Sequence, residues 1–168
     1  LILDNLMDLT HAAYLHPNTL GSEATTRGTM KVEELGAETL LIKNWYPNGL
    51  PPPAFYLSGA VAADVMVDLW ADVKWQSPGA LHFQTGVMPT GRPRSESANI
   101  FSAQLLTPET ETTTHYFWKA FINYQLGTPE LIGHVEAAIK KAFADEDEPM
   151  LTDVRDRMAG REFWSLKP

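Results

Sequence analysis

Polar side chains suited to binding a metal ion are concentrated near the start of the chain. Asn5, Asp8, His11 and His16 all lie in this one short segment. On a helix, which turns by about 100° per residue, the four positions fall within one arc of about 140°. Burying such groups without partners costs about 1–3 kcal/mol each. Because a metal ion would satisfy them together, the segment predicts a metal site.

The spacing of the two histidines sets a condition on the geometry of this site. His11 and His16 are five residues apart, which corresponds to about 140° around a straight helix. Zinc-binding histidine pairs are usually four residues apart, on one helical face. A spacing of five works only if the helix unwinds at its end, and Pro17 follows His16 directly. We therefore predict a helix over residues 2–16 that ends at this proline.

A third ligand must come from elsewhere, and the dense carboxylate cluster of the chain is residues 145–148. Pro149 should bend the helix that carries this cluster, since proline removes a backbone hydrogen bond. Helical phase puts Glu146 nearest the apolar stripe and Asp147 at its edge, so periodicity does not choose between them. Two histidines and one carboxylate leave about three positions open on a metal, as in the facial triad of non-haem Fe(II) oxygenases.

The elements that must position these residues follow from periodicity and turn residues. Alternating or β-branched stretches predict strands near residues 28–33, 39–46, 65–76, 80–88, 99–107 and 112–124. Residues 47–53 hold four prolines and a glycine, which indicates a loop. Thr128 and Pro129 start a long C-terminal helix with one apolar stripe. Strands segregated from helices predict an α+β, helix-grip (START/Bet v1-like) fold, a curved antiparallel sheet around that helix.

Composition excludes several classes of function. The 168 residues are enough for one domain, and their net charge of -8 argues against a nucleic-acid partner. No apolar run approaches the ~20 residues of a membrane-spanning helix, so we expect no membrane partner. The chain has no cysteine, which excludes disulfides, thiol catalysis and an iron–sulfur cluster held by these residues. We expect a cytoplasmic protein.

Residues 4–16, DNLMDLTHAAYLH, resemble the iron-site motif of Rieske non-haem iron aromatic oxygenases. The likeness is greatest to the vanillate and dicamba O-demethylase oxygenase subunits. It implies that His11 and His16 are iron ligands and that Asn5 lies beside the iron. It also implies that Asp8 relays an electron from a Rieske cluster on the neighbouring subunit.

The likeness extends over nearly the whole chain. Residues 142–147 resemble the family's Phe-X-X-Glu-Asp ending, whose aspartate is the third ligand, and this selects Asp147 over Asp145 or Glu146. The family's N-terminal Rieske domain, with its two Cys and two His, has no counterpart here. We therefore expect residues 1–168 to be the mononuclear non-haem iron catalytic domain, a fragment of a longer protein.

The resemblance also suggests residues that contact the substrate. His82 and Gln104 match positions that touch an aromatic substrate in the family, and His115 is a further candidate. Strand alternation puts His82 on the side of the sheet opposite Leu81 and Phe83. The competing interpretation is that all three are ordinary sheet residues.

The function implied is that of a terminal oxygenase component. It would use Fe(II), O2 and electrons from NAD(P)H, delivered through a reductase or ferredoxin and a Rieske [2Fe–2S] cluster, to hydroxylate or O-demethylate an aromatic compound. Relay between subunits implies a homotrimer. Two alternatives stay open: a non-catalytic module that binds hydrophobic ligands, and a zinc hydrolase that uses the same three ligands.

Overall fold

One antiparallel sheet of six strands forms the body of the molecule, and each strand pairs with the next along the chain. The computed structural model describes residues 1–124 and 128–161. The strands are β1 (Thr29–Gly36), β2 (Thr39–Gly49), β3 (Val67–Gln76), β4 (Ala80–Pro89), β5 (Ala98–Pro108) and β6 (Thr114–Ile122). All six predicted strands are present, with small shifts at their ends. β2 continues through Pro47 to Gly49, because an irregularity in its pairing with β3 after Tyr46 accommodates the proline.

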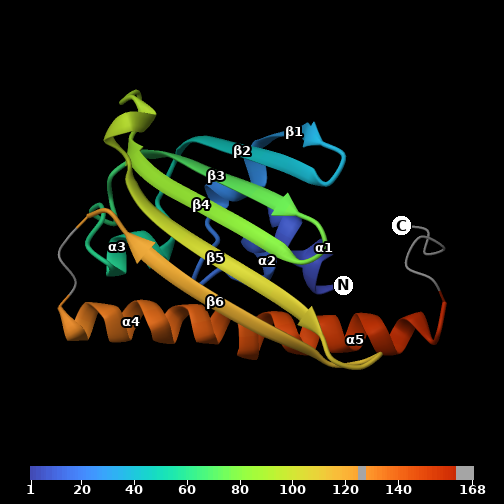
Figure 1. Ribbon diagram of the computed structural model, residues 1–168. Helices are drawn as coiled ribbons and strands as arrows, with labels where there is room; N and C mark the ends of the chain where they lie inside the picture. Colours follow the sequence, from blue (N-terminus) through green and yellow to red (C-terminus); the bar gives the residue numbers. More distant parts are fainter. Residues whose placement is uncertain (125–127, 162–168) are drawn as a thin grey trace.

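A long C-terminal helical rod packs against the sheet beside β6 (Figure 1). It consists of α4 (Pro129–Lys140), the π-helical segment η4 (Lys141–Asp147) and α5 (Glu148–Met158). As predicted, Thr128 caps its start by accepting a hydrogen bond from the backbone of Leu131, and Pro129 occupies the first turn. The sheet curves around this rod, which confirms the helix-grip α+β fold.

The prediction of a single helix over residues 2–16 is wrong. The segment contains three short pieces: α1 (Ile2–Met7), the 3-10 helix η1 (Leu9–His11) and α2 (Ala12–Leu15). The break falls at Asp8, whose backbone is extended and whose side chain accepts a hydrogen bond from the Thr10 N–H. Aspartate is a strong capping residue, so it starts a new helical turn here instead of continuing the first. The chain therefore changes direction before His11 as well as after it.

Two apolar clusters fill the inner side of the sheet. The first joins α1 to the strands through Leu6, Ile42, Val73, Leu81 and Leu106. The second surrounds α3 (Pro53–Leu57) and consists of Tyr46, Phe55, Val67, Leu69 and Val87. Because successive side chains of a strand point to opposite faces, each strand contributes alternate residues to this inner side.

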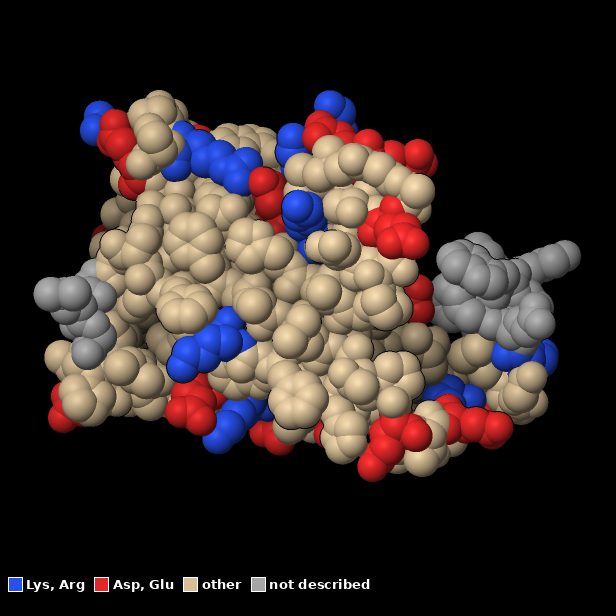
Figure 2. All heavy atoms as spheres, viewed as in Figure 1, with Lys and Arg blue, Asp and Glu red and all other residues tan. Residues whose placement is uncertain are grey.

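The outer surface carries charges of both signs around a large uncharged area. In the face shown in Figure 2, the Lys and Arg side chains are scattered and do not form a continuous stripe. In the described ranges, no helix is both long enough and apolar enough to cross a bilayer.

Candidate metal centre

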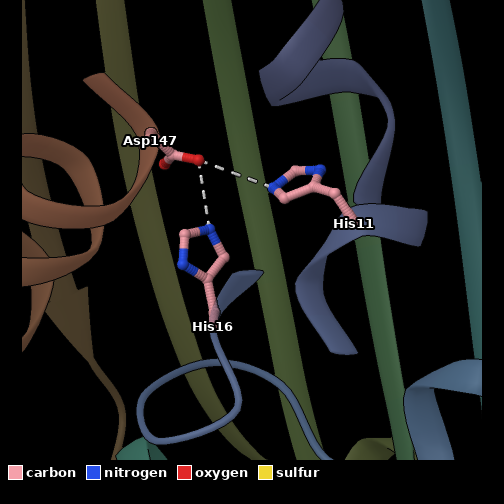
Figure 3. Close-up of side chains that lie close together, drawn as sticks. All are labelled: His11, His16 and Asp147. Atoms are coloured by element: carbon pink, nitrogen blue, oxygen red, sulfur yellow. Dashed lines mark ion pairs between the residues drawn. The ribbon is translucent and has the colours of Figure 1, made fainter. Parts of the chain in front are cut away.

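Three side chains from opposite ends of the chain meet on the inner side of the sheet. His11 ends η1, His16 follows α2, and Asp147 ends the π-helical segment η4. Figure 3 shows both imidazoles pointing toward the Asp147 carboxylate. One ligand atom from each residue lies within 4.8 Å of the others. The structure therefore brings together the three residues that the sequence singled out.

The distance between His16 and Asp147 suits one shared ion, and the distance between His11 and Asp147 is wider. The Nε2 atoms of His16 and His11 lie 3.2 Å and 3.8 Å from Asp147 Oδ1. Two atoms bound to one ion at about 2.0–2.2 Å lie about 3 Å apart when their bonds meet at a right angle. His16 and Asp147 are buried, whereas the His11 side chain is 23% exposed. Among the three side chains, His11 is therefore the most accessible to solvent.

Both imidazoles are held through their other ring nitrogen. His11 Nδ1 contacts the backbone carbonyl of Asp8, and His16 Nδ1 lies 2.7 Å from Glu146 Oε2. Each Nδ1 donates its proton to these acceptors, which leaves the Nε2 lone pair free to face the cluster. Tying the outer nitrogen in this way is the usual arrangement for histidines that bind a metal.

Asn5 completes the cluster from α1. It is buried, and its Nδ2 donates to Asp147 Oδ1 over 3.1 Å and lies 3.5 Å from His11 Nε2. The amide therefore contacts two of the three candidate ligands. Asp8, by contrast, is exposed, and its side chain caps η1. It is linked to the cluster through its carbonyl, which holds His11.

The π-helical segment explains how two adjacent carboxylates serve one site. Ala142 and Asp147 are both buried although they are five residues apart, which in an α-helix would place them about 140° apart. In η4 the backbone N–H of Glu148 bonds to the carbonyl of Phe143, five residues back, and this wider turn brings such positions to one side. The sequence predicts a bend at Pro149, and the structure has this π-helical segment directly before that residue. Pro149 itself lies in the first turn of α5 and has no N–H to donate to the carbonyls of η4 behind it.

The carboxylates of Asp147 and Glu146 also make the site negatively charged. Burial lowers the pKa of His16, but the hydrogen bonds and negative charges of Asp147 and Glu146 outweigh burial and raise it above the usual 6.5. Thr19 supports Glu146 with a hydrogen bond of 3.0 Å. The same negative charges that favour a proton on His16 would favour a metal cation in its place.

The cluster opens into a cavity of about 390 Å³ between the two apolar clusters and the C-terminal rod. Phe83, Ile100 and Trp118 line it from the sheet, Phe55 from α3 and Phe143 from the rod. The sequence could not assign Trp118 to this cavity, because strand alternation does not tell which side chains pack and which leave a space. A cavity of this kind suits an aromatic ligand.

The three residues proposed to touch a substrate are placed differently. Gln104 lines the cavity and is buried. Its Oε1 accepts a hydrogen bond of 2.8 Å from the hydroxyl of Tyr116, whose pKa is raised by burial and by the charge of Asp147. His82 is exposed and points away from the cavity-lining Phe83, next to it in β4.

His115 also lies outside the cavity. It is 55% exposed, 3.5 Å from Glu109, and its ring stacks on Phe117. Side chains alternate along β4 and β6, so His82 and His115 belong to the outer face of the sheet. Contrary to the expectation from the sequence, neither His82 nor His115 lines the cavity of this chain.

The fold and the site together define a class: helix-grip domains in which two histidines and one carboxylate meet at an apolar cavity. Along residues 1–168 the chain matches the family model of the vanillate O-demethylase oxygenase C-terminal domain. It is 37% identical over 172 residues to the oxygenase component of chloroacetanilide N-alkylformylase of Rhizorhabdus wittichii. It is 31% identical over 170 residues to the dicamba O-demethylase oxygenase component of Stenotrophomonas maltophilia.

Solved structures give the same result. Dicamba monooxygenase bound to 3,6-dichlorosalicylic acid superposes with a TM-score of 0.89 at 29% identity, over 99% of this chain and 48% of that one. The structure with non-heme iron and dicamba has a TM-score of 0.61 at 26% identity, over 99% of this chain and 46% of that one. The alignments to the two relatives above span all of this chain but only 48% and 49% of the relatives' lengths. The chain therefore belongs to the vanillate O-demethylase oxygenase C-terminal domain family.

Proposed function

We propose that residues 1–168 are the mononuclear iron catalytic domain of a terminal oxygenase that hydroxylates or O-demethylates an aromatic compound. The observation that carries this proposal is the meeting of His11, His16 and Asp147 at the wall of an apolar cavity. Family membership supports it, because two relatives are named as oxygenase components or subunits of O-demethylases and a third as the iron-sulfur subunit of a monooxygenase system.

In this proposal His11 and His16 would hold Fe(II) through their Nε2 atoms, which face the cluster, and Asp147 would hold it through its carboxylate. The donor set fits iron, since two imidazoles and one carboxylate leave positions open for oxygen and substrate. A related structure was solved with non-heme iron. Iron held by these residues would supply the oxygen chemistry, and the electrons for it would come from NAD(P)H through a reductase or ferredoxin. The Rieske [2Fe–2S] cluster on this route would lie outside the 168 residues, which contain no cysteine.

The chain's own residues would bind and orient the reactants. Phe83, Trp118 and Phe143 supply an apolar wall for an aromatic ring and exclude water from the metal end. Asn5 would hold Asp147 in place through its hydrogen bond. For a methoxy substrate, hydroxylation of the methyl carbon would lead to a phenol and formaldehyde. The relatives' names point to dicamba, vanillate, toluene-4-sulfonate and chloroacetanilide chemistry.

Asp8 would connect this site to a second subunit. Its side chain is exposed while its carbonyl holds His11, so one residue joins the molecular surface to a candidate ligand. We assign it the transfer of an electron from a Rieske cluster on a neighbouring subunit. That role requires a partner copy, and we propose a homotrimer in the cytoplasm, where NAD(P)H is supplied.

A zinc hydrolase would use the same donors, because zinc also binds two histidines and one carboxylate. A module that only binds hydrophobic ligands would need the cavity and no metal. The metal content of the protein separates these three functions. Zinc bound in place of iron would support the hydrolase, and a metal-free protein would support the binding module.

The test is metal analysis of protein from iron-replete cells, with two histidine variants. His11→Ala removes a candidate ligand and should abolish iron binding. His115→Ala removes an exposed histidine of the outer face and should retain the iron content of the unmodified protein. Full iron occupancy in His11→Ala would refute the assignment.

A further inference from the structure

A chain of hydrogen bonds runs along the sheet wall of the cavity. The hydroxyl of Tyr116 on β6 donates to Gln104 Oε1 on β5 over 2.8 Å. Gln104 Nε2 donates to Ser102 Oγ on the same strand over 3.0 Å. Gln104 and Ser102 are buried and both line the cavity. We refer to Tyr116, Gln104 and Ser102 as the polar relay.

The surroundings of Tyr116 give the relay one direction. Tyr116 packs on Phe143, with ring centroids 5.3 Å apart, in the apolar cluster beside the cavity. Its hydroxyl proton needs an acceptor there, and Gln104 Oε1 is that acceptor. This fixes the amide so that its NH2 group faces Ser102. If the amide were turned around, the buried phenol would lose its acceptor.

Ser102 is left with a free donor at the end of the relay. Its oxygen accepts from Gln104, and among the described residues no atom accepts the Ser102 hydroxyl proton. A contrasting case is Ser58, which lines the same cavity but bonds to the carbonyl of Phe55 and the hydroxyl of Tyr124. Ser102 can therefore donate to a ligand without breaking a bond inside the protein.

The rest of the cavity wall disfavours an anion. In the described ranges, its lining contains no Lys or Arg side chain, and its ionisable groups are Asp147, Tyr46 and the imidazoles of His11, His16 and His134. His134 is exposed. Asp147 and the adjoining Glu146 already place two carboxylates at the metal end. Away from the metal end, a buried carboxylate or sulfonate on the ligand would find no Lys or Arg side chain to compensate its lost hydration.

We propose that this cavity selects neutral aromatic substrates that carry a hydrogen-bond acceptor such as a carbonyl group, and that Ser102 donates to this acceptor. The proposal rests on the proposed oxygenase function and names its substrate class. Gln104 and Tyr116 act as positioning residues in this scheme, because their hydrogen bonds orient the Ser102 hydroxyl.

The test compares three ligands of one shape by calorimetric titration of the iron-loaded chain. 2-Methoxyacetophenone is neutral and has a carbonyl, 2-methoxybenzoate is its anionic counterpart, and 2-ethylanisole lacks the carbonyl. The ketone should bind about tenfold or more tightly than the benzoate, since an uncompensated buried charge is costly. Equal or tighter binding of the benzoate would overturn the proposal, as would a failure of the ketone to bind.

Variants then test the relay itself. Ser102→Ala should weaken ketone binding by about fivefold, the usual value of one neutral hydrogen bond, and leave 2-ethylanisole unchanged. Tyr116→Phe should likewise lower the ratio of the affinity for the ketone to the affinity for 2-ethylanisole, because it frees the Gln104 amide to turn. Ser58→Ala, the matched control, should leave the ratio as it is. An unchanged ratio in Ser102→Ala or Tyr116→Phe would contradict the relay.

Iron content measured on the same samples judges the proposed function separately. A chain without iron would contradict the oxygenase assignment whatever its ligand preference. The affinities for the three ligands, compared with one another in each variant, decide the inference about Ser102.

Discussion

The candidate metal centre depends on residues that hold the ligands as much as on the ligands themselves. Glu146 shows this most clearly, since it binds the outer nitrogen of His16 and is in turn bound by Thr19. Its side chain is 14% exposed, so the contact is largely shielded from water. We expect Glu146 to fix the orientation of His16 and to increase the basicity of its Nε2.

Glu146→Ala should weaken iron binding by about 10–100-fold without changing the three ligands, the usual effect of removing such a partner. Competition with a chelator of known affinity measures this loss. Asp145→Ala is the matched control, because Asp145 is the preceding residue and its side chain is 68% exposed. An equal loss of affinity in both variants would show that total charge matters and orientation does not.

The pH dependence of iron binding follows from His16. Burial lowers its pKa, but the hydrogen bonds and charges of Asp147 and Glu146 raise it by more than burial lowers it. The metal-free protein therefore keeps a proton on His16 to a higher pH than an ordinary histidine of pKa 6.5. A metal needs the neutral imidazole. Iron affinity should therefore fall as the pH is lowered from about 8 to about 6. Chelator competition across this range checks the trend, and a constant affinity would argue against His16 as a ligand.

At the scale of elements, α2, which lies between the two histidines, is in close backbone contact with the turn that follows His16. The N–H of Gly21 donates to the carbonyl of His16 over 2.8 Å. A Cβ built at Gly21 would lie 2.0 Å from the carbonyl oxygen of Ala12, the first residue of α2. The turn after His16 can approach α2 this closely only because residue 21 has no side chain.

Gly21→Ala should push α2 away from the turn and move both histidines. We expect a loss of about 1–3 kcal/mol in the free energy of unfolding, the usual cost of overpacking, together with weaker iron binding. Gly36→Ala is the control, since a Cβ there meets nothing within 4 Å. Urea denaturation and metal analysis measure the two effects, and wild-type values for Gly21→Ala would contradict the proposed contact.

The C-terminal rod acts as one element that reaches both the sheet and the metal centre. Phe143 packs against Tyr116 and Trp118 of β6, and Asp147 ends the same π-helical segment. Anchoring the segment by an aromatic contact four residues before the carboxylate sets where Asp147 lies relative to the histidines. The wider turn lets Glu146 and Asp147 both face them.

At the scale of the whole molecule, stability and ligand binding use different parts of the sheet. Leu6, Ile42, Val73, Leu81 and Leu106 form a packed cluster. Of these five, Leu6 also lines the cavity. The cavity extends between this cluster and the one around α3, so core packing can be changed without altering most of its wall.

Leu81→Ala should lower the free energy of unfolding by about 2–5 kcal/mol, because it leaves a void in the buried cluster. Iron binding by the folded protein should persist, since Leu81 does not line the cavity. The control is Leu105→Ala on neighbouring β5, where the side chain is 51% exposed. Urea denaturation compares them, and a similar small loss in both would show that the cluster is not a packed core.

Much of the fold could be predicted because it depends on local patterns. Alternation and turn residues located all six strands, and Thr128 with Pro129 located the start of the long helix. The prediction failed at Asp8, where a capping side chain competes with the continuation of a helix over a few residues. Such competition is decided by how the following segment packs, which periodicity does not report.

The sequence by itself determined the kinds of ligand and the order of the elements, because both are properties of residue type and short-range spacing. Only the tertiary structure decided that Asp147 faces the Nε2 atoms of both histidines while Glu146 binds the outer nitrogen of His16, since the π-helical turn of η4 changes the phase on which a helical wheel relies. It also decided that Gln104 lines the cavity while His82 and His115 lie on the outer face. Which face of a strand is covered depends on contacts with distant segments, and no local pattern contains that information.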